Sequence, residues 1–345
     1  MSEAVRAALA NVVEGGILTF EGARAAMGAV MDGEATPSQL AAFLVALRMR
    51  GETIDELAGF AAAMRDRALR VEAPAGAVDT CGTGGDRSGT FNISTTAALI
   101  VAAAGVPVAK HGNRAITSRS GSADVLEALG VPMEQTAESV AADLRTFGFA
   151  FMFAPGFNPA MRHAGPTRRE IGVRTAFNLL GPLTNPAGAR RQVIGVGDAA
   201  SARRIAEVAR RLGTDRTLVV GGDGVDELPL DGTGRLLDVT DDRIDERAVR
   251  PGELGLAQAP TSALAGGSPE ENAAMVEGIL RGAAGPRRDV ALLNAAAAFL
   301  AAGRVPDLGA GVVLAAATID EGSAAALLER LREARRVRAA GEAGT

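Results

Sequence analysis

The fold of this chain is decided by the stretch AVDTCGTGGDRSGTFNISTTAALIVAAA, which spans residues 77–104. Residues 77–81 are predicted to form a β-strand and residues 94–104 a helix. Between them lie the turn glycines Gly82, Gly84 and Gly85 and the helix start Asn92-Ile93-Ser94-Thr95. A strand, a glycine turn and a helix start in this order present backbone N–H groups to a phosphate. The stretch therefore predicts a unit that can bind a phosphate group.

The segments downstream extend the same pattern. Further strands are predicted at residues 106–109, 149–153, 192–196 and 217–220, and helices at residues 123–129 and 200–212. Strands that alternate with helices are typical of a parallel sheet. The sequence therefore predicts an α/β fold with a mostly parallel central sheet.

Both ends of the chain show helical patterns instead. Near the N-terminus, the capping boxes Thr36–Gln39 and Thr53–Glu56 mark the starts of two helices. The C-terminal third is predicted to be helical at residues 269–280, 289–301 and 324–336. Because 345 residues are many for one hydrophobic core, we expect two domains.

The composition limits the classes of function. The chain has a net charge of −5, no Trp or Tyr, and 11 Phe, so it is poorly equipped to coat nucleic acid or stack on bases. Its only cysteine, Cys81, excludes an intramolecular disulfide. No apolar run approaches the roughly 18 residues that a membrane span needs, and the first residues lack a signal-peptide profile. We therefore expect a cytoplasmic protein that binds neither nucleic acid nor a membrane.

Lys110 is the only lysine in the chain, beside 35 arginines. An ammonium is a compact point charge with rotatable donors, whereas a guanidinium is a wide planar fork. A single lysine in such a chain therefore indicates a place where only an ammonium fits, such as a tight phosphate pocket. The alternative is that this lysine has no special role.

Two long segments are almost free of acidic residues, although the chain has 41 of them. Residues 87–123 contain no Asp or Glu but four cationic residues, Arg87, Lys110, Arg114 and Arg119. Residues 146–197 contain one acid, Glu170, against His163, Arg162, Arg168, Arg169, Arg174, Arg190 and Arg191. A structural role explains any one of these arginines equally well, but the asymmetry over both segments predicts anion binding. At least one of Arg168 and Arg169 is expected to point into a cleft.

Two adjacent carboxylates, Asp226 and Glu227, follow the strand predicted at residues 217–220. They are expected at the edge of the sheet where α/β proteins bind ligands. Side by side they repel each other unless a hard cation neutralises them, and Mg²⁺ shared with phosphate oxygens is the common solution. A solvated acidic turn is the alternative. One cysteine and two histidines exclude a Cys/His metal cluster.

Common phosphate-binding motifs do not match the glycine turn. A P-loop requires lysine after glycine, but Lys110 follows Ala109. A dinucleotide-binding fingerprint requires a third glycine at position 87, which is arginine.

Taken together, the ordered motifs resemble the anthranilate phosphoribosyltransferase family over nearly the whole chain. Besides the helical start, they are 82–86 (GTGGD), 92–95 (NIST), 110–114 (KHGNR), 120–124 (SGSAD), 174–186 (RTAFNLLGPLTNP) and 226–227 (DE). Any one of these motifs alone is weak, but their order and length make coincidence negligible.

The resemblance implies a fold of the nucleoside-phosphorylase-like type. It implies a helical domain of residues 1–72, joined by helices from about 163–186, and an α/β domain of residues 73–162 and 187–345. The active site would lie at the hinge, and a homodimer would form through the helical domain. The implied reaction transfers a phosphoribosyl group from phosphoribosyl pyrophosphate to the amine of anthranilate, with Mg²⁺ as cofactor.

The resemblance also implies roles for individual residues. The phosphoribosyl pyrophosphate site would comprise Gly82, Gly85, Asp86, Thr90, Asn92, Ser94, Thr95, Lys110 and Ser122. Gly82, Asn113 and Arg168 would contact anthranilate, and Ser94, Asp226 and Glu227 would hold Mg²⁺. No residue is assigned as a general acid or base.

Three positions depart from the family pattern. Arg87 stands where members usually carry glycine, Cys81 where an aliphatic residue is usual, and Asn158 where many have histidine near the anthranilate entry. Two other readings remain open. A pyrimidine nucleoside phosphorylase should carry a lysine soon after the glycine turn, and a non-catalytic nucleic-acid-binding relative should lack Asp226 and Glu227.

Overall fold

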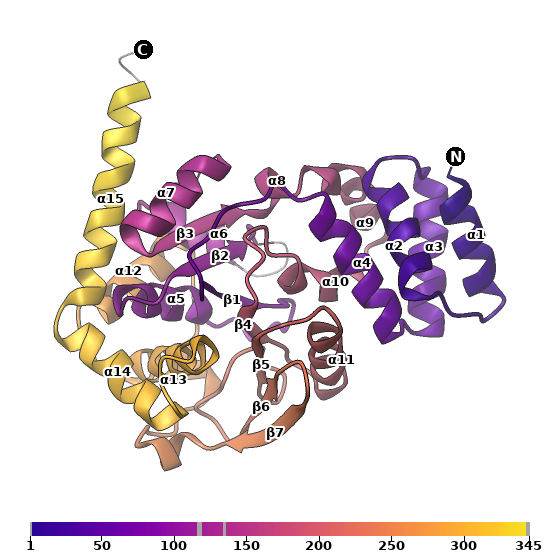
Figure 1. Ribbon diagram of the computed structural model, residues 1–345. Helices are drawn as coiled ribbons and strands as arrows, with labels where there is room; N and C mark the ends of the chain where they lie inside the picture. The colour runs from indigo at the N-terminus through magenta and orange to yellow at the C-terminus, as the bar shows by residue number, and fades with distance from the viewer. Residues whose placement is uncertain (1, 116–118, 134–135, 343–345) are drawn as a thin grey trace.

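The computed structural model describes residues 2–115, 119–133 and 136–342. These residues form a helical lobe and a larger α/β lobe, and Figure 1 shows the two lobes side by side. The N-terminal helices lie at one end of the molecule, and the last helix, α15 (Ser323–Glu342), extends from the opposite end.

Four helices begin the helical lobe: α1 (Glu3–Val13), α2 (Phe20–Met31), α3 (Pro37–Arg50) and α4 (Ile54–Asp66). The two predicted capping boxes are confirmed, because Thr36 accepts a hydrogen bond from Gln39 N and Thr53 accepts one from Glu56 N. Each box satisfies N–H groups that have no partner within the helix. The start of α4 also holds a neighbouring loop, since Glu56 Oε1 accepts from Leu18 N at 2.9 Å.

The α/β lobe is built on a seven-stranded sheet in the order β3-β2-β1-β4-β5-β6-β7. Its strands are β1 (Val78–Gly82), β2 (Val108–Gly112), β3 (Phe149–Phe153), β4 (Arg191–Gly195), β5 (Arg216–Gly221), β6 (Gly234–Val239) and β7 (Ile244–Val249). β1 to β5 are parallel, and β6 and β7 are antiparallel, so the prediction of a mostly parallel sheet is confirmed. The strand order reverses between β1 and β4, and such a switch point is where open α/β sheets bind ligands.

The helices of this lobe cover both faces of the sheet. α5 (Ile93–Ala103) and α13 (Pro286–Ala302) contact one face, while α11 (Ala199–Arg211) and α7 (Ala137–Phe147) contact strands on the other. The remaining helices around the first face are α6 (Ser122–Ala128), α12 (Pro269–Leu280), α14 (Leu308–Asp320) and α15. Two short 3₁₀ turns, η3 (Pro251–Leu254) and η4 (Thr261–Leu264), precede α12.

Alternation along β5 divides its apolar side chains between two of the hydrophobic cores. In β5, Leu218 and Val220 pack with α5 and α13, whereas Val219 packs with α11 and the helical lobe. The second core is continuous from the sheet into the helical lobe because α11 also contacts α4. One core therefore spans both lobes.

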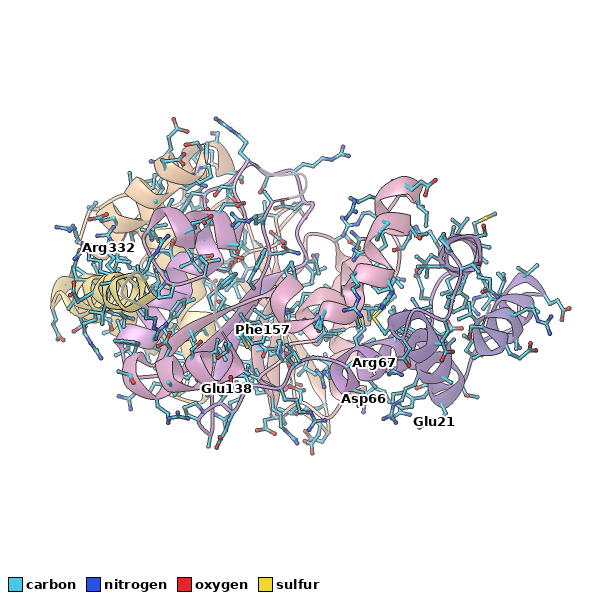
Figure 2. All side chains as sticks on the ribbon, turned by 90° about the horizontal axis from the view of Figure 1, so that it is seen from above. Glu21, Asp66, Arg67, Glu138, Phe157 and Arg332 are labelled. Carbon is cyan, nitrogen blue, oxygen red and sulfur yellow. The ribbon has the colours of Figure 1, made fainter. Side chains whose placement is uncertain are left out.

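The segment after β3 returns to the helical lobe. It contains α8 (Ala154–Phe157), η1 (Pro159–His163), α9 (Gly165–Ile171), α10 (Phe177–Leu180) and η2 (Gly181–Leu183). η1 contacts α2, α9 contacts α3, and α10 contacts α4. The first connection between the lobes runs alongside, since Leu69 N donates to the carbonyl of Phe157 at 2.8 Å. Figure 2 labels Phe157 together with Asp66, the last residue of α4, and Arg67, which follows it.

Several elements differ from the sequence-based expectation. β2 begins at Val108 and continues to Gly112, so Lys110 and His111 belong to the strand rather than to the loop after it. The helices α7 and α14 and the antiparallel pair β6–β7 were not predicted. Within the described ranges, no helix is by itself long and apolar enough to cross a membrane, and the bent pair α14–α15 meets the criteria of length and composition only when taken together.

Candidate active site

The glycine turn, residues 83–92, joins β1 to α5 at the carboxyl edge of the sheet. Gly84, Gly85 and Gly89 adopt φ values of 68°, 73° and 68°, which favour glycine. Arg87 has a φ of 61° and is the only non-glycine residue of the described chain in this region. A glycine would adopt this left-handed backbone more easily, and the chain keeps the conformation despite the side chain of Arg87.

The turn is fixed to the loop after β5 through Asp226. The Asp226 carboxylate accepts a hydrogen bond from Gly84 N at 2.8 Å, and the backbone N–H of Asp226 donates to Asp86 Oδ2 at 3.3 Å. A β-carbon added to Gly82 would lie 2.3 Å from Asp226 Oδ2, closer than real side chains approach. Gly82 is thus required because the Asp226 carboxylate lies against its backbone.

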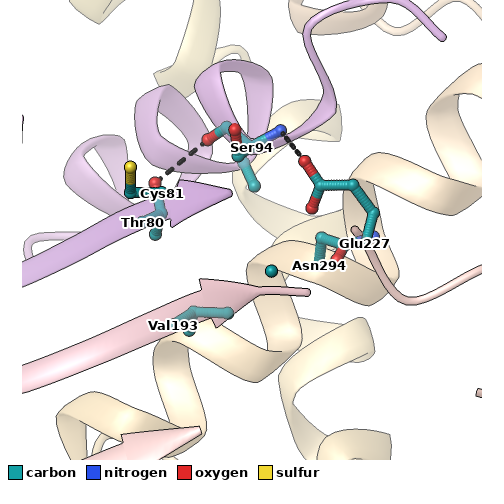
Figure 3. A pocket seen from close by; sticks show the side chains of 8 residues that line it. Thr80, Cys81, Ser94, Val193, Glu227 and Asn294 are labelled. Carbon is teal, nitrogen blue, oxygen red and sulfur yellow. Dashed lines mark hydrogen bonds between the residues drawn. The ribbon is translucent and has the colours of Figure 1, made fainter. Parts of the chain in front are cut away.

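Glu227 is joined to the start of α5. Its Oε1 accepts a hydrogen bond from Ser94 N at 3.1 Å, and the Ser94 carbonyl accepts one from Thr80 Oγ1 at 3.1 Å. Figure 3 shows both bonds in a small pocket between the ends of β1 and β4. The three residues predicted to hold Mg²⁺, Ser94, Asp226 and Glu227, therefore meet at the switch point of the sheet.

The electrostatics of this pocket fit a bound cation. Burial, followed by the charge of Asp86, raises the pKa of Asp226, and burial together with Asp226 raises the pKa of Glu227. Lys110 opposes the shift at Glu227 but cannot balance three carboxylates. In the part of the chain that the structure describes, no three His, Cys, Asp and Glu side chains form a complete metal site. A hard cation would therefore take further oxygens from Ser94, phosphate and water.

Lys110 lies inside the sheet, with 1% of its surface exposed. Its ammonium donates to the carbonyl of Thr80 on the neighbouring strand β1, and Thr80 Oγ1 lies 3.5 Å away. Full burial against the Thr80 carbonyl favours a compact ammonium over a wide guanidinium at this position. Its contact with a phosphate stays a prediction.

The remaining residues predicted to bind phosphoribosyl pyrophosphate lie around the start of α5 and the end of β2. Thr95 is buried, and its hydroxyl has no hydrogen-bond partner within the described residues. Asn92 is tied to two other segments, because its Oδ1 accepts from Asn272 Nδ2 at 2.9 Å and its Nδ2 donates to the Ser120 carbonyl at 3.2 Å. Thr90 Oγ1 lies 3.2 Å from Ser88 Oγ. Asn92 therefore already serves to position loops.

Asn113 and Ser122 lie together at the end of β2. Ser122 Oγ donates to the Asn113 carbonyl at 3.3 Å, and Asn113 Oδ1 accepts from Arg114 N at 2.8 Å. Arg168 lies on α9, in the segment that packs on the helical lobe. Among the described residues, no hydrogen bond or ion pair joins Arg168 to another residue of the predicted site. The structure therefore does not link Arg168 directly to the phosphate-binding part of that site.

Sequence reasoning missed a buried polar network behind β2. Asp79 Oδ1 accepts from His111 N at 3.1 Å, and His111 Nε2 lies 3.2 Å from Nδ2 of Asn158. Burial lowers the pKa of His111 to about 4, so its ring is neutral near pH 7. Asn158 therefore supports the histidine of the KHGNR motif. The short strand signal around Lys110 could have indicated that His111 is buried.

Two family models match the chain. The model described as "Glycosyl transferase family, helical bundle domain" matches residues 6–68, and the model described as "Glycosyl transferase family, a/b domain" matches residues 74–325. Anthranilate phosphoribosyltransferase from Chloroflexus aggregans is 54% identical over 330 residues, which are 95% of this chain and 97% of that protein. The same enzyme from Symbiobacterium thermophilum is 53% identical over 331 residues, again 95% of this chain and 97% of that protein.

Solved structures agree with these matches. The crystal structure of anthranilate phosphoribosyltransferase from Thermus thermophilus aligns with a TM-score of 0.91 and 48% identity, over 95% of this chain and 99% of that one. The Saccharomyces cerevisiae enzyme in complex with PRPP (phosphoribosyl pyrophosphate) and Mg aligns with a TM-score of 0.88 and 26% identity, over 97% of this chain and 99% of that one.

Proposed function

This chain belongs to the anthranilate phosphoribosyltransferase family, and from this membership we infer its reaction and the part that each residue plays in it. It transfers the phosphoribosyl group of 5-phosphoribosyl 1-pyrophosphate to the amine of anthranilate, a step of tryptophan biosynthesis. The products are N-(5-phosphoribosyl)anthranilate and pyrophosphate. The observation that carries this conclusion is the 54% identity over 95% of the chain.

Mg²⁺ is the cofactor, and when bound it neutralises charge on the pyrophosphate as that group leaves. We propose that Ser94, Asp226 and Glu227 hold it, because Glu227 accepts a hydrogen bond from the Ser94 backbone N–H, and because burial with a neighbouring carboxylate raises the pKa of both Asp226 and Glu227. The proposed phosphoribosyl pyrophosphate site is completed by Gly82, Gly85, Asp86, Thr90, Asn92, Thr95, Lys110 and Ser122. In support, the glycine turn lies at the same edge of the sheet as these carboxylates, and its Gly84 N–H donates to Asp226.

The protein's own part in the reaction is mainly positioning. The bond from ribose C1 to the pyrophosphate oxygen breaks, the amine nitrogen bonds to C1, and the nitrogen then loses a proton. We assign no residue to that proton transfer. The protein holds the amine opposite the leaving group, so the two substrates react within one oriented complex instead of by collision in solution. This orientation supplies much of the rate enhancement. Gly82, Asn113 and Arg168 are proposed to hold anthranilate in that orientation.

The assay that tests this function follows the fluorescence of anthranilate. With phosphoribosyl pyrophosphate and Mg²⁺, the purified chain should remove the fluorescence and release one pyrophosphate per anthranilate consumed. Omission of either substrate or chelation of Mg²⁺ should stop the reaction. Absence of turnover, with phosphorolysis of a pyrimidine nucleoside instead, would overturn the proposal.

We further propose that the chain forms a homodimer through its helical lobe. Val13, Ile17 and Met49 are 69%, 65% and 84% exposed. They lie at one end of the lobe, because α1 packs on α3 and Arg50 donates to the Gly16 carbonyl. Light scattering should give twice the mass of the chain, and Met49→Lys should weaken the association. The matched control is Val313→Lys, which changes an apolar side chain that is 70% exposed on α14.

The division into domains is also a proposal. Residues 1–72 and the helices of about 163–186 would move as one helical domain, with residues 73–162 and 187–345 as the other. The contacts of η1, α9 and α10 with α2, α3 and α4 support this grouping. A cytoplasmic location likewise stays a prediction from the sequence.

A further inference from the structure

One arginine outside the predicted site lies against the glycine turn. A β-carbon placed on Gly85 would be 3.4 Å from Nη1 of Arg174 and 4.0 Å from its Cζ. Arg174 belongs to the segment between α9 and α10, which is anchored in the core of the helical lobe by Ala176 and Phe177. The contact therefore brings a guanidinium from one lobe onto the phosphate-binding turn of the other.

The guanidinium of Arg174 has no structural partner in the described residues. It is exposed, and no hydrogen bond or ion pair there involves it. Two other arginines of the same acid-poor segment do have partners: Arg190 pairs with Asp215 at 2.6 Å, and Arg191 donates to the Ala302 carbonyl. The charge of Arg174 contributes to lowering the pKa of Asp198, but the Asp198 carboxylate already caps α11 by accepting a hydrogen bond from Ser201 N at 2.8 Å.

The position of the Arg174 guanidinium indicates which anion it binds. Gly85 is flanked by Gly84, whose N–H binds Asp226, and by Asp86, whose carboxylate accepts from Asp226 N. An anion that contacts Gly85 is therefore next to the carboxylates proposed to hold Mg²⁺. In phosphoribosyl pyrophosphate the pyrophosphate is the part that shares such a cation.

We propose that Arg174 is a further substrate-binding residue that contacts the pyrophosphate of phosphoribosyl pyrophosphate on the glycine turn. This assignment rests on the proposed function. Charge grows on the pyrophosphate as its bond to C1 breaks, so the guanidinium stabilises the leaving group as well as the bound substrate. Because it comes from the helical lobe, it also links pyrophosphate binding to the contact between the lobes.

The test compares Arg174→Ala and Arg174→Lys with Arg169→Ala. Arg169 is a matched control, since it is an exposed arginine of the neighbouring helix and also lacks an ion pair among the described residues. Titration calorimetry with magnesium pyrophosphate measures binding without turnover, and ribose 5-phosphate is the second probe. Thermal melting checks that each variant is folded.

Arg174→Ala should weaken pyrophosphate binding and kcat/KM for phosphoribosyl pyrophosphate about 10- to 100-fold, as expected for a lost charge-assisted hydrogen bond. Arg174→Lys should restore part of the loss, while Arg169→Ala and ribose 5-phosphate binding should change little. Unchanged pyrophosphate binding in Arg174→Ala, or a loss confined to ribose 5-phosphate, would overturn the assignment.

The two proposals fail in different ways. If the parent protein binds magnesium pyrophosphate but does not consume anthranilate, the proposed reaction is wrong, and the comparison of Arg174 variants still decides the anion contact. If the parent protein turns over both substrates and the Arg174 variants match it, only the assignment of Arg174 is wrong.

Discussion

The guanidinium carbon of Arg168 lies 4.7 Å from the centre of the Phe177 ring. Stacking on an aromatic face holds the side chain in place without neutralising it. Burial lowers the pKa of Arg168, but an arginine starts so high that it stays charged at neutral pH. In the described ranges no carboxylate pairs with Arg168. Its half-buried guanidinium is therefore fixed in position and can bind an anion.

Arg168→Ala should therefore raise the KM for anthranilate. A charge-assisted hydrogen bond to a carboxylate contributes about 1.5–3 kcal/mol, which corresponds to roughly 10- to 150-fold. The constant for phosphoribosyl pyrophosphate should change much less. Arg169→Ala is the control, because adjacent helical side chains point about 100° apart. A selective effect of Arg169→Ala instead would place the carboxylate contact one residue later.

Asp226→Asn combined with Glu227→Gln should lower the rate mainly by weakening Mg²⁺ binding, and excess Mg²⁺ should restore part of it. Asp223→Asn is the matched control, since Asp223 is an exposed acid of the same loop. If the metal dependence of the double variant equals that of the parent, the acidic pair is only a solvated turn.

The same pair predicts how stability depends on Mg²⁺. Folding raises the pKa of both carboxyl groups above their unfolded values of about 4. The ionised pair therefore destabilises the folded protein at high pH, and this destabilisation is relieved as the pH falls below the raised pKa values. Near pH 8 without Mg²⁺, the double variant should melt no lower than the parent. At a Mg²⁺ concentration that saturates the parent but not the weakened site, Mg²⁺ should raise the Tm of the parent only, and an equal rise in both proteins would argue against a site at these carboxylates.

Lys110→Arg should damage the use of phosphoribosyl pyrophosphate although the charge is kept. The ammonium is buried and donates to the Thr80 carbonyl of β1, and overpacking such a site costs about 1–3 kcal/mol. The Tm should therefore fall together with the activity. Lys110→Met, which keeps the length but removes the charge, separates packing from charge. Activity of Lys110→Arg within a few-fold of the parent would show that the site does not require an ammonium.

Cys81 should be inert to alkylation in the folded protein. Burial, followed by the charge of Asp79, raises the pKa of its thiol to about 12. At pH 8 only about one thiol in ten thousand is then ionised, and the thiolate is the reactive form. Mass spectrometry after treatment with iodoacetamide should show no label until the protein is unfolded in guanidinium chloride. Rapid stoichiometric labelling of the folded protein would contradict the raised pKa.

The sequence by itself determined the elements that depend on neighbouring residues. The capping boxes of α3 and α4 are local signals, because each needs only residues three apart, and both helices begin where the boxes predict. The strand 149–153 and the helix 269–280 were also predicted at their observed bounds. The motif carrying Asp226 and Glu227 could be recognised without knowing which residues surround it.

Only the tertiary structure decided how these local units meet. The bond from Gly84 to Asp226 joins residues 142 positions apart, and the contact of Arg174 with Gly85 joins two lobes. Sheet order brings them together, and that order depends on packing over the whole chain. The antiparallel pair β6–β7 escaped prediction because β7 carries charged residues on an exposed edge, and Lys110 proved to be buried because β2 extends beyond its apolar residues. Local chemistry therefore gave the parts of the site, and long-range packing placed them.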